Sequence, residues 1–161
     1  MIKKIFGKNG NYIGIDASAF YTYFNNRIVA DYDTDPNKII YDNLSGYAES
    51  KGVCLNLDFT FNNGFKIIAG GTLMENTLTE NGITEQQILT ENFTGTWAVS
   101  YKIRSKELAI DYTGNIYSPM RLPLLSETDP RNAYSPWWSI QNIQLTYNGF
   151  KNFQIYGGVK N

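Results

Sequence analysis

Three aspartates are the side chains of this chain best suited to acid–base chemistry. Asp16, Asp58 and Asp111 each fall on the polar phase of an alternating segment, and paired carboxylates are common equipment for proton transfer. No spacing along the chain holds any two of them together. We therefore interpret them as charges on the polar face of a sheet, balanced by lysines such as Lys66 and Lys102, and we expect no catalytic residue.

The composition provides few residues for nucleophilic catalysis or metal binding. The chain has one cysteine, Cys54, and no histidine, which excludes His-dependent triads and leaves the thiol without an activating base. Cys54 sits among Asn and Asp on a polar strand phase, so we interpret it as a small filler. The segments "DTDPN" (33–37) and "ETDPRN" (127–132) resemble calcium loops but lack their acidic spacing, and we expect Asp-Pro turns there. We expect no metal, no cofactor and no enzymatic activity.

Four side chains near the last long link are candidates for contact with a small solute. Arg121, Tyr134, Trp137 and Trp138 are of the types that most often anchor a ligand. A second interpretation stays open, in which the tryptophans belong to an interfacial aromatic band and the other two pack within the loop.

The elements that carry these residues are strands. Apolar and polar residues alternate with a period of two, which predicts strands rather than helices. The alternating segments cover 13–23, 53–61, 65–73, 96–103, 108–116, 137–147 and 153–159, and residues 1–6 form the tail of another strand. We predict an all-β, antiparallel, up-and-down sheet of a stub plus seven strands. No helix is convincing, and "ENGITEQQILTENF" (80–93) holds at most one short turn.

Short and long links alternate along the chain. The short links are 7–10, 62–64, 104–107 and 148–149, and the long ones are 25–46, 75–92 and 118–136. Most runs reach about 10 residues, near the ~9–11 that cross a bilayer obliquely, and aromatic residues gather towards both strand ends. Short periplasmic turns, long external loops and two aromatic girdles are typical of outer-membrane barrels. We therefore predict a transmembrane β-barrel segment whose apolar face meets lipid.

Charge and hydropathy exclude other classes. The chain has 14 basic and 15 acidic residues and a net charge of −1, so nothing indicates nucleic acid as a partner. No run approaches the ~20 apolar residues of a membrane helix, and the first residues, "MIKKIFGKNGNY", do not form a signal peptide.

Several segments together resemble a known family. They are "AFYTYFNNRIVADYDTDPNKIIYDN" (19–43), "NLDFTFNNGFKIIAGGTLM" (56–74), "DYTGNIYSPMRLP" (111–123), "YSPWWSIQNIQLT" (134–146) and "IYGGVKN" (155–161). In these segments the chain resembles the carboxy-terminal β-barrel of a TonB-dependent outer-membrane receptor of the Bacteroidetes kind. The resemblance implies a large plugged barrel in the outer membrane of a Gram-negative bacterium. Such a receptor imports a scarce solute (a siderophore, cobalamin or glycan) with energy from TonB.

The chain also departs from the family pattern. It has no export signal, no TonB box, no plug and no final aromatic-ended strand. We therefore expect residues 1–161 to be a fragment of a single barrel domain. Its expected partners are outer-membrane lipid, the rest of the receptor including the plug, the TonB complex through the missing amino-terminal region, and a small solute. The alternative is a self-contained eight-stranded barrel that binds a small ligand, soluble or in the outer membrane, with residues 1–6 as a full strand.

Overall fold

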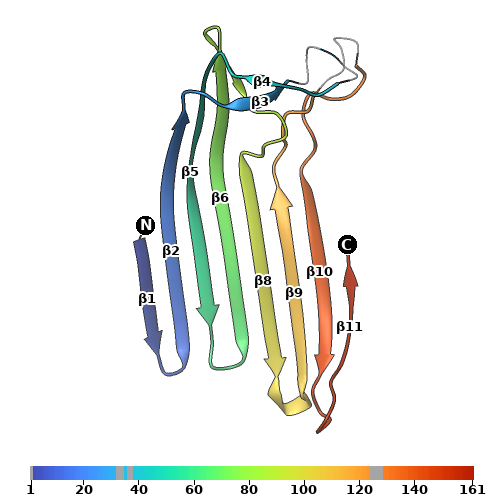
Figure 1. Cartoon of the computed structure of the whole chain (residues 1–161). Helices are drawn as coiled ribbons and strands as arrows, with labels where there is room; N and C mark the ends of the chain where they lie inside the picture. The colour runs from blue at the N-terminus through green and yellow to red at the C-terminus, as the bar shows by residue number, and fades with distance from the viewer. Residues whose placement is uncertain (1, 32–34, 36–37, 124–128) are drawn as a thin grey trace.

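The alternating segments form one antiparallel sheet in the computed structural model, which describes residues 2–31, 35, 38–123 and 129–161 (Figure 1). Its main strands are β1 (Ile2–Lys8), β2 (Asn11–Phe24), β5 (Gly46–Thr60), β6 (Phe65–Glu80), β8 (Phe93–Ile103), β9 (Leu108–Tyr117), β10 (Trp138–Tyr147) and β11 (Ile155–Lys160).

Each main strand pairs with the next one along the chain. The order is β1-β2-β5-β6-β8-β9-β10-β11, and every pairing is antiparallel. This confirms the predicted stub plus seven strands in up-and-down order. The sheet is a single open layer with β1 and β11 at opposite edges (Figure 1). The self-closed eight-stranded alternative, which needs these two strands to pair, finds no support in this topology.

Tight turns join the strands at one end of the sheet. Asn9 and Gly10 have φ values of 54° and 80° between the paired residues Lys8 and Asn11, as a two-residue type I′ turn requires. Gly64, at φ 90°, takes the left-handed position of the turn between β5 and β6. A short 3-10 helix, η1 (Arg104–Lys106), joins β8 to β9. These turns lie at the end opposite the long links (Figure 1).

The long links contain strands that the sequence analysis did not predict. β6 continues to Glu80 and turns back through Asn81-Gly82 into β7 (Ile83–Gln86), so the short turn expected in 80–93 is a β-hairpin. The first link holds a separate hairpin of β3 (Ile28–Asp31) and β4 (Ile40–Asn43). The last tight turn was also predicted too short, because β11 begins at Ile155 rather than near residue 153.

The register separates a mainly apolar face from a mainly polar one. Residues directly opposite each other share a face, and one row crosses the whole sheet with only apolar or aromatic members. That row is Phe6, Ile13, Phe59, Ile67, Val99, Tyr112, Ile143 and Val159. A row on the other face runs through Thr60, Lys66, Ser100, Asp111 and Gln144. We call the two surfaces the apolar face and the polar face.

Nothing within the described residues covers the apolar face. Of the described apolar residues, only Leu44, Ala48 and Ala109 are buried, and none of them lies on the apolar face, because the register places Ala48 and Ala109 on the polar face and Leu44 precedes β5. The chain exposes 11345 Å², whereas a compact soluble monomer of the same mass would expose about 8,100 Å². The excess exposed surface and the uncovered apolar face together indicate that this face contacts another apolar phase or a partner.

Helices play almost no part in the fold. Within the described ranges, no helix is long and apolar enough to cross a membrane.

Candidate functional site

The long links are tied together into one structure at their end of the sheet. Arg27 Nη1 in the first link donates to Gln87 Oε1 in the second at 3.1 Å. Arg121 Nη1 in the third link lies 2.6 Å from Glu85 Oε2 in the second, and the Leu89 amide donates to the Arg121 carbonyl at 2.9 Å. We call this assembly of residues 25–45, 81–92 and 118–136, as far as the structure describes them, the rim.

The β3–β4 hairpin lies across the top of the sheet as part of the rim (Figure 1). The Leu44 amide donates to the Arg27 carbonyl at 2.8 Å and so closes the base of the hairpin. Ile28 and Tyr41 remain 67% and 70% exposed, although such side chains are normally covered. The hairpin therefore presents exposed apolar and aromatic side chains within the rim.

The four predicted ligand residues do not converge on one point. Arg121 and Tyr134 lie opposite each other in an isolated β-bridge, so these two are neighbours. The Arg121 guanidinium is engaged by Glu85 and by the Gln86 carbonyl, 3.3 Å away. Tyr134 is half exposed. In this geometry Arg121 holds two links together, while Tyr134 offers an accessible ring and hydroxyl.

The two tryptophans lie on opposite faces. Trp137 is tilted against Phe93, with ring centroids 6.1 Å apart, and Phe93 lies opposite Leu73 on the apolar face. Trp138 stacks on Tyr117 at 4.0 Å, and this pair belongs to the polar face. Only Trp137 therefore fits an interfacial aromatic band, and Trp138 faces the same side as the polar rows.

The aromatic bands are otherwise close to expectation. Tyr23 stacks on Tyr47 at 5.2 Å near the rim, and Phe65 contacts Tyr101 at 6.1 Å near the short turns. Trp97 departs from the prediction: its ring packs at mid-strand against Tyr112, 6.0 Å away, rather than at the rim end.

Two of the three aspartates on the polar face, Asp58 and Asp111, bond to hydroxyl groups. Ser100 Oγ donates to Asp111 Oδ1, and Thr60 Oγ1 donates weakly to Asp58 Oδ1 at 3.4 Å. Among the residues described, neither aspartate forms an ion pair with Lys66 or Lys102. Direct ion pairs of Asp58 and Asp111 with these two lysines are therefore absent from the described residues, and the wider charge balance stays a prediction. The reason is register, because Ser100 stands between Lys66 and Asp111 in their shared row.

The remaining candidates for chemistry have structural partners. Cys54 Sγ accepts from Thr72 Oγ1 at 3.4 Å on the polar face. Most of segment 33–37 lies outside the described residues. In the second Asp-Pro segment, the Arg131 guanidinium donates to the Asp129 carboxylate, which raises the pKa of Arg131. The Arg131 amide also donates to Asp129 Oδ1 at 3.0 Å, as in an Asp-centred turn. No group of three or more metal-ligating side chains occurs in the described part.

Sequence reasoning missed the residues that hold the rim together. Arg27, Glu85 and Gln87 stand in links whose mutual contacts span more than thirty positions, such as the 60 between Arg27 and Gln87. Local pattern carries no signal for such pairings. The β3–β4 hairpin did leave one, since "RIVA" and "IIYDN" contain short apolar runs on either side of the sequence Asp-Pro-Asn.

Comparison with known proteins adds one match. The family model described as "TonB dependent receptor-like, beta-barrel" matches residues 2–161. No curated protein matches the chain.

Proposed function

The chain belongs to the TonB-dependent receptor β-barrel family, and from this premise we propose that it forms one sector of the wall and rim of an importer for a scarce solute. The family consists of outer-membrane transport receptors of Gram-negative bacteria that work with TonB and a plug domain. In this proposal the apolar face meets lipid, the polar face lines the lumen, and the rim lies outside the cell.

The observation that carries the proposal is the one-sided sheet. Its apolar row runs unbroken across the main strands, and no described residue covers it. β6 has 16 residues, so at a tilt of ~45° and ~3.3 Å per residue it rises about 37 Å. A barrel's lipid-facing band is only ~25 Å tall, which leaves the rim end of β6 to project beyond the lipid.

The open edges fit a sector of a larger wall. A transmembrane sheet cannot leave backbone N–H and C=O groups unpaired in lipid. β1 and β11 each have one unpaired side in this topology. We assign these two edges to further strands of a longer receptor chain, whose plug would occupy the lumen beside the polar face.

The rim supplies the proposed solute contacts. Tyr134 is accessible, and Trp138 stands on the polar face just below the rim, where its stack with Tyr117 fixes its orientation. Arg121 is assigned a positioning role, because its guanidinium is already held by Glu85 and the Gln86 carbonyl. Ferric siderophores, cobalamin and glycans remain the candidate solutes.

The orientation can be tested by thiol labelling on intact cells. In the full-length receptor with Cys54→Ser, a membrane-impermeant maleimide should label Tyr41→Cys in the β3–β4 hairpin. Asn63→Cys in the opposite turn should react only after the outer membrane is permeabilised. The reverse pattern, or equal labelling of both in intact cells, would contradict the assignment of the rim to the outside.

Transport itself needs a separate measurement. Uptake of labelled ferric siderophores, cobalamin and oligosaccharides should be compared in cells with and without TonB. We expect TonB-dependent uptake of one class of solute. Arg121→Ala should reduce this uptake several-fold because the rim loses a tie between two links. The effect on stability should be small, since a surface ion pair contributes only ~0–1 kcal/mol. Lys38→Ala, which breaks the exposed pair with Asp35, is the control and should leave uptake unchanged. Uptake that is the same with and without TonB for every class of solute would refute the importer function.

A further inference from the structure

The tight turns at one end of the sheet carry an excess of positive charge. Their charged residues are Lys8, Arg104, Lys106 and Lys151, against Glu107 alone. Two of these turns meet, because the Asn148 amide of the β10–β11 turn donates to the Glu107 carbonyl of the β8–β9 turn at 2.8 Å. The two turns lie side by side at the same end of the sheet (Figure 1). Three of the four cations therefore belong to one pair of adjacent turns.

These three cations have no partner of opposite charge. Arg104, Lys106 and Lys151 are exposed, and none of them forms an ion pair within the residues that the structure describes. At the rim, by contrast, the Arg121 guanidinium lies 2.6 Å from the Glu85 carboxylate. The positive charge of the two turns is therefore available to an anionic partner.

An exposed aromatic cluster flanks Lys151 in the chain. The Phe150 ring packs edge-on against Tyr147, with centroids 5.2 Å apart, and stacks on Phe153 at 4.2 Å. Tyr147 has the same strand phase as Ile143 of the apolar row, so the cluster continues the apolar face past the end of β10. Phe150 and Phe153 remain 43% and 58% exposed. Aromatic rings and cations together are typical of a protein surface at the boundary between hydrocarbon and headgroups.

The position of the turns along the strands places the cations at headgroup level. Near the short turns Phe65 contacts Tyr101 at 6.1 Å, and aromatic girdles of this kind flank the hydrocarbon band of a barrel. Arg104 follows Tyr101 by three residues, which is about 7 Å further out at ~3.3 Å per residue and a tilt of ~45°. The two turns therefore end among the headgroups rather than in the hydrocarbon.

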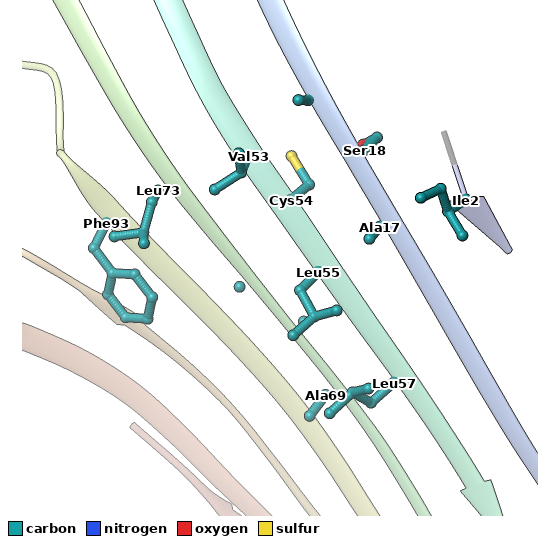
Figure 2. Close-up of a pocket in the computed structure, with 13 residues that line it drawn as sticks. Ile2, Ala17, Ser18, Val53, Cys54, Leu55, Leu57, Ala69, Leu73 and Phe93 are labelled. Carbon is teal, nitrogen blue, oxygen red and sulfur yellow. The ribbon is translucent and has the colours of Figure 1, made fainter. Parts of the chain in front are cut away.

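The middle of the apolar face offers a lipid no comparable charge where Figure 2 shows it. A hollow of about 670 Å³ between β1 and β8 is lined by uncharged side chains, among them Val53, Leu55, Leu73 and Phe93. Any acyl chain can lie on such a surface. A preference for one kind of lipid must therefore come from groups that contact its headgroup.

We propose that Arg104, Lys106 and Lys151 bind the headgroup of one anionic phospholipid on the periplasmic side of the membrane, with Phe150 and Phe153 against its acyl chains. The inference rests on the proposed function, because it needs the apolar face to lie in lipid and the tight turns to face the periplasm. It goes further by assigning a ligand to turns that otherwise only connect strands.

The charges of the two turns select the headgroup. Three cations against the single carboxylate of Glu107 attract a headgroup with net negative charge. The ammonium of a zwitterionic headgroup would instead meet the same three cations and be repelled. A soluble acidic polymer would satisfy the cations but would leave the rings of Phe150 and Phe153 in water, so the aromatic cluster favours a lipid.

Native mass spectrometry of the full-length receptor with added phosphatidylglycerol or phosphatidylethanolamine measures this preference. We expect one phosphatidylglycerol to be retained about tenfold more tightly than phosphatidylethanolamine. The double variant Arg104→Gln/Lys106→Gln and the single variant Lys151→Gln should each reduce that preference several-fold, and both should fold because these side chains are exposed. Phe153→Ser should weaken the retention of both lipids, since it removes apolar contact without changing the charge.

Lys8→Gln is the matched control. Lys8 is an equally exposed lysine of a tight turn, but it lies in the β1–β2 turn at the opposite edge of the sheet. Its substitution removes the same charge from the receptor and should leave the preference for phosphatidylglycerol unchanged.

Equal retention of both lipids by the unsubstituted receptor, or a preference that survives in both charge variants, would overturn the inference. So would binding to isolated cell-wall sacculi that the charge variants lose while they still prefer phosphatidylglycerol, because an acidic polymer would then occupy the turns. Thiol labelling reads the proposed function separately. Labelling of Asn63→Cys in intact cells would overturn both proposals, whereas the lipid results named here leave the importer function intact.

Discussion

Neighbouring residues of β5 illustrate how differently the two faces of the sheet are built. On the apolar face, Leu55 and Leu57 contribute only bulk and hydrophobicity, and their cross-strand neighbours Gly71 and Ala69 are small. On the polar face, Cys54 accepts from Thr72 and Ser50 Oγ donates to Asn76 Oδ1 at 2.6 Å. The stability of the apolar face therefore depends on each side chain being apolar, whereas the stability of the polar face depends on hydrogen bonds between particular side chains.

The difference teaches what each face can tolerate. In lipid there is no water to solvate a misplaced charge, so polarity dominates the cost of a substitution on the apolar face. On the polar face water remains available, and the cost is that of one lost hydrogen bond, ~0.5–1.5 kcal/mol. Substitutions on the two faces should therefore fall into separate ranges.

The largest effect is expected for a charge on the apolar face. Leu57→Arg should destabilise the receptor by ~2–4 kcal/mol, the cost of an arginine near the bilayer midplane. Asn56→Arg, one residue away on the polar face, should change stability by less than ~0.5 kcal/mol. Equilibrium unfolding of the full-length receptor in lipid vesicles measures both. An equal loss of stability from the two arginine substitutions would contradict the assignment of the two faces.

The second effect comes from packing within the apolar face. Gly114→Ala should cost ~1–3 kcal/mol through overpacking, because its Cβ would overlap the Trp97 ring and approach the Ile140 carbonyl at 2.9 Å. Gly157→Ala meets no atom within 4 Å and should be neutral in the same unfolding assay. A neutral Gly114→Ala would mean that Trp97 does not lie over this glycine.

A smaller effect is expected on the polar face. Ser100→Ala removes the hydrogen bond to Asp111 and should cost ~1 kcal/mol. A double-mutant cycle with Asp111→Ala should give a coupling of similar size. A coupling energy near zero would show that the Ser100–Asp111 hydrogen bond does not stabilise the polar face.

The smallest effect on stability is expected at Gln141, a polar residue on the apolar face. Gln141 lies opposite Gly114 on the apolar face, where its Oε1 accepts from the Tyr112 hydroxyl at 2.6 Å. Gln141→Leu removes this bond but also removes an amide from lipid, so we expect a change within ~0.5 kcal/mol. Ile143→Leu on the same strand is the control. A loss well above 1 kcal/mol would identify this pair as a specific polar contact within the apolar face.

The sheet could be predicted from sequence because its determinants are local. Alternation decides which face a residue takes, and Asn-Gly at 9–10 decides where a strand turns. The β6–β7 turn at Asn81-Gly82 carries the same Asn-Gly signal. The opposite placement of Trp137 and Trp138 also follows from a period of two, once β10 is known to begin at residue 138.

The rim could not be predicted in the same way. Its main ties join Arg27 to Gln87 and Arg121 to Glu85, and each depends on how whole links are placed by the strands below. Any arginine and any glutamate in three long links are equally compatible with the sequence pattern. Only the register of β5, β6 and β8 brings these particular pairs within reach.

The alternation of tight turns with long links has a further consequence for how the wall assembles. Tight turns join β1 to β2, β5 to β6, β8 to β9 and β10 to β11, whereas the rim links join these hairpins to one another. Hairpins with short connections form in ~1–10 μs, and closing a longer connection costs chain entropy that rises with its length. We therefore expect each hairpin to form before it joins its neighbours. On this expectation, the rim links can lengthen or shorten with little effect on the formation of the hairpins themselves.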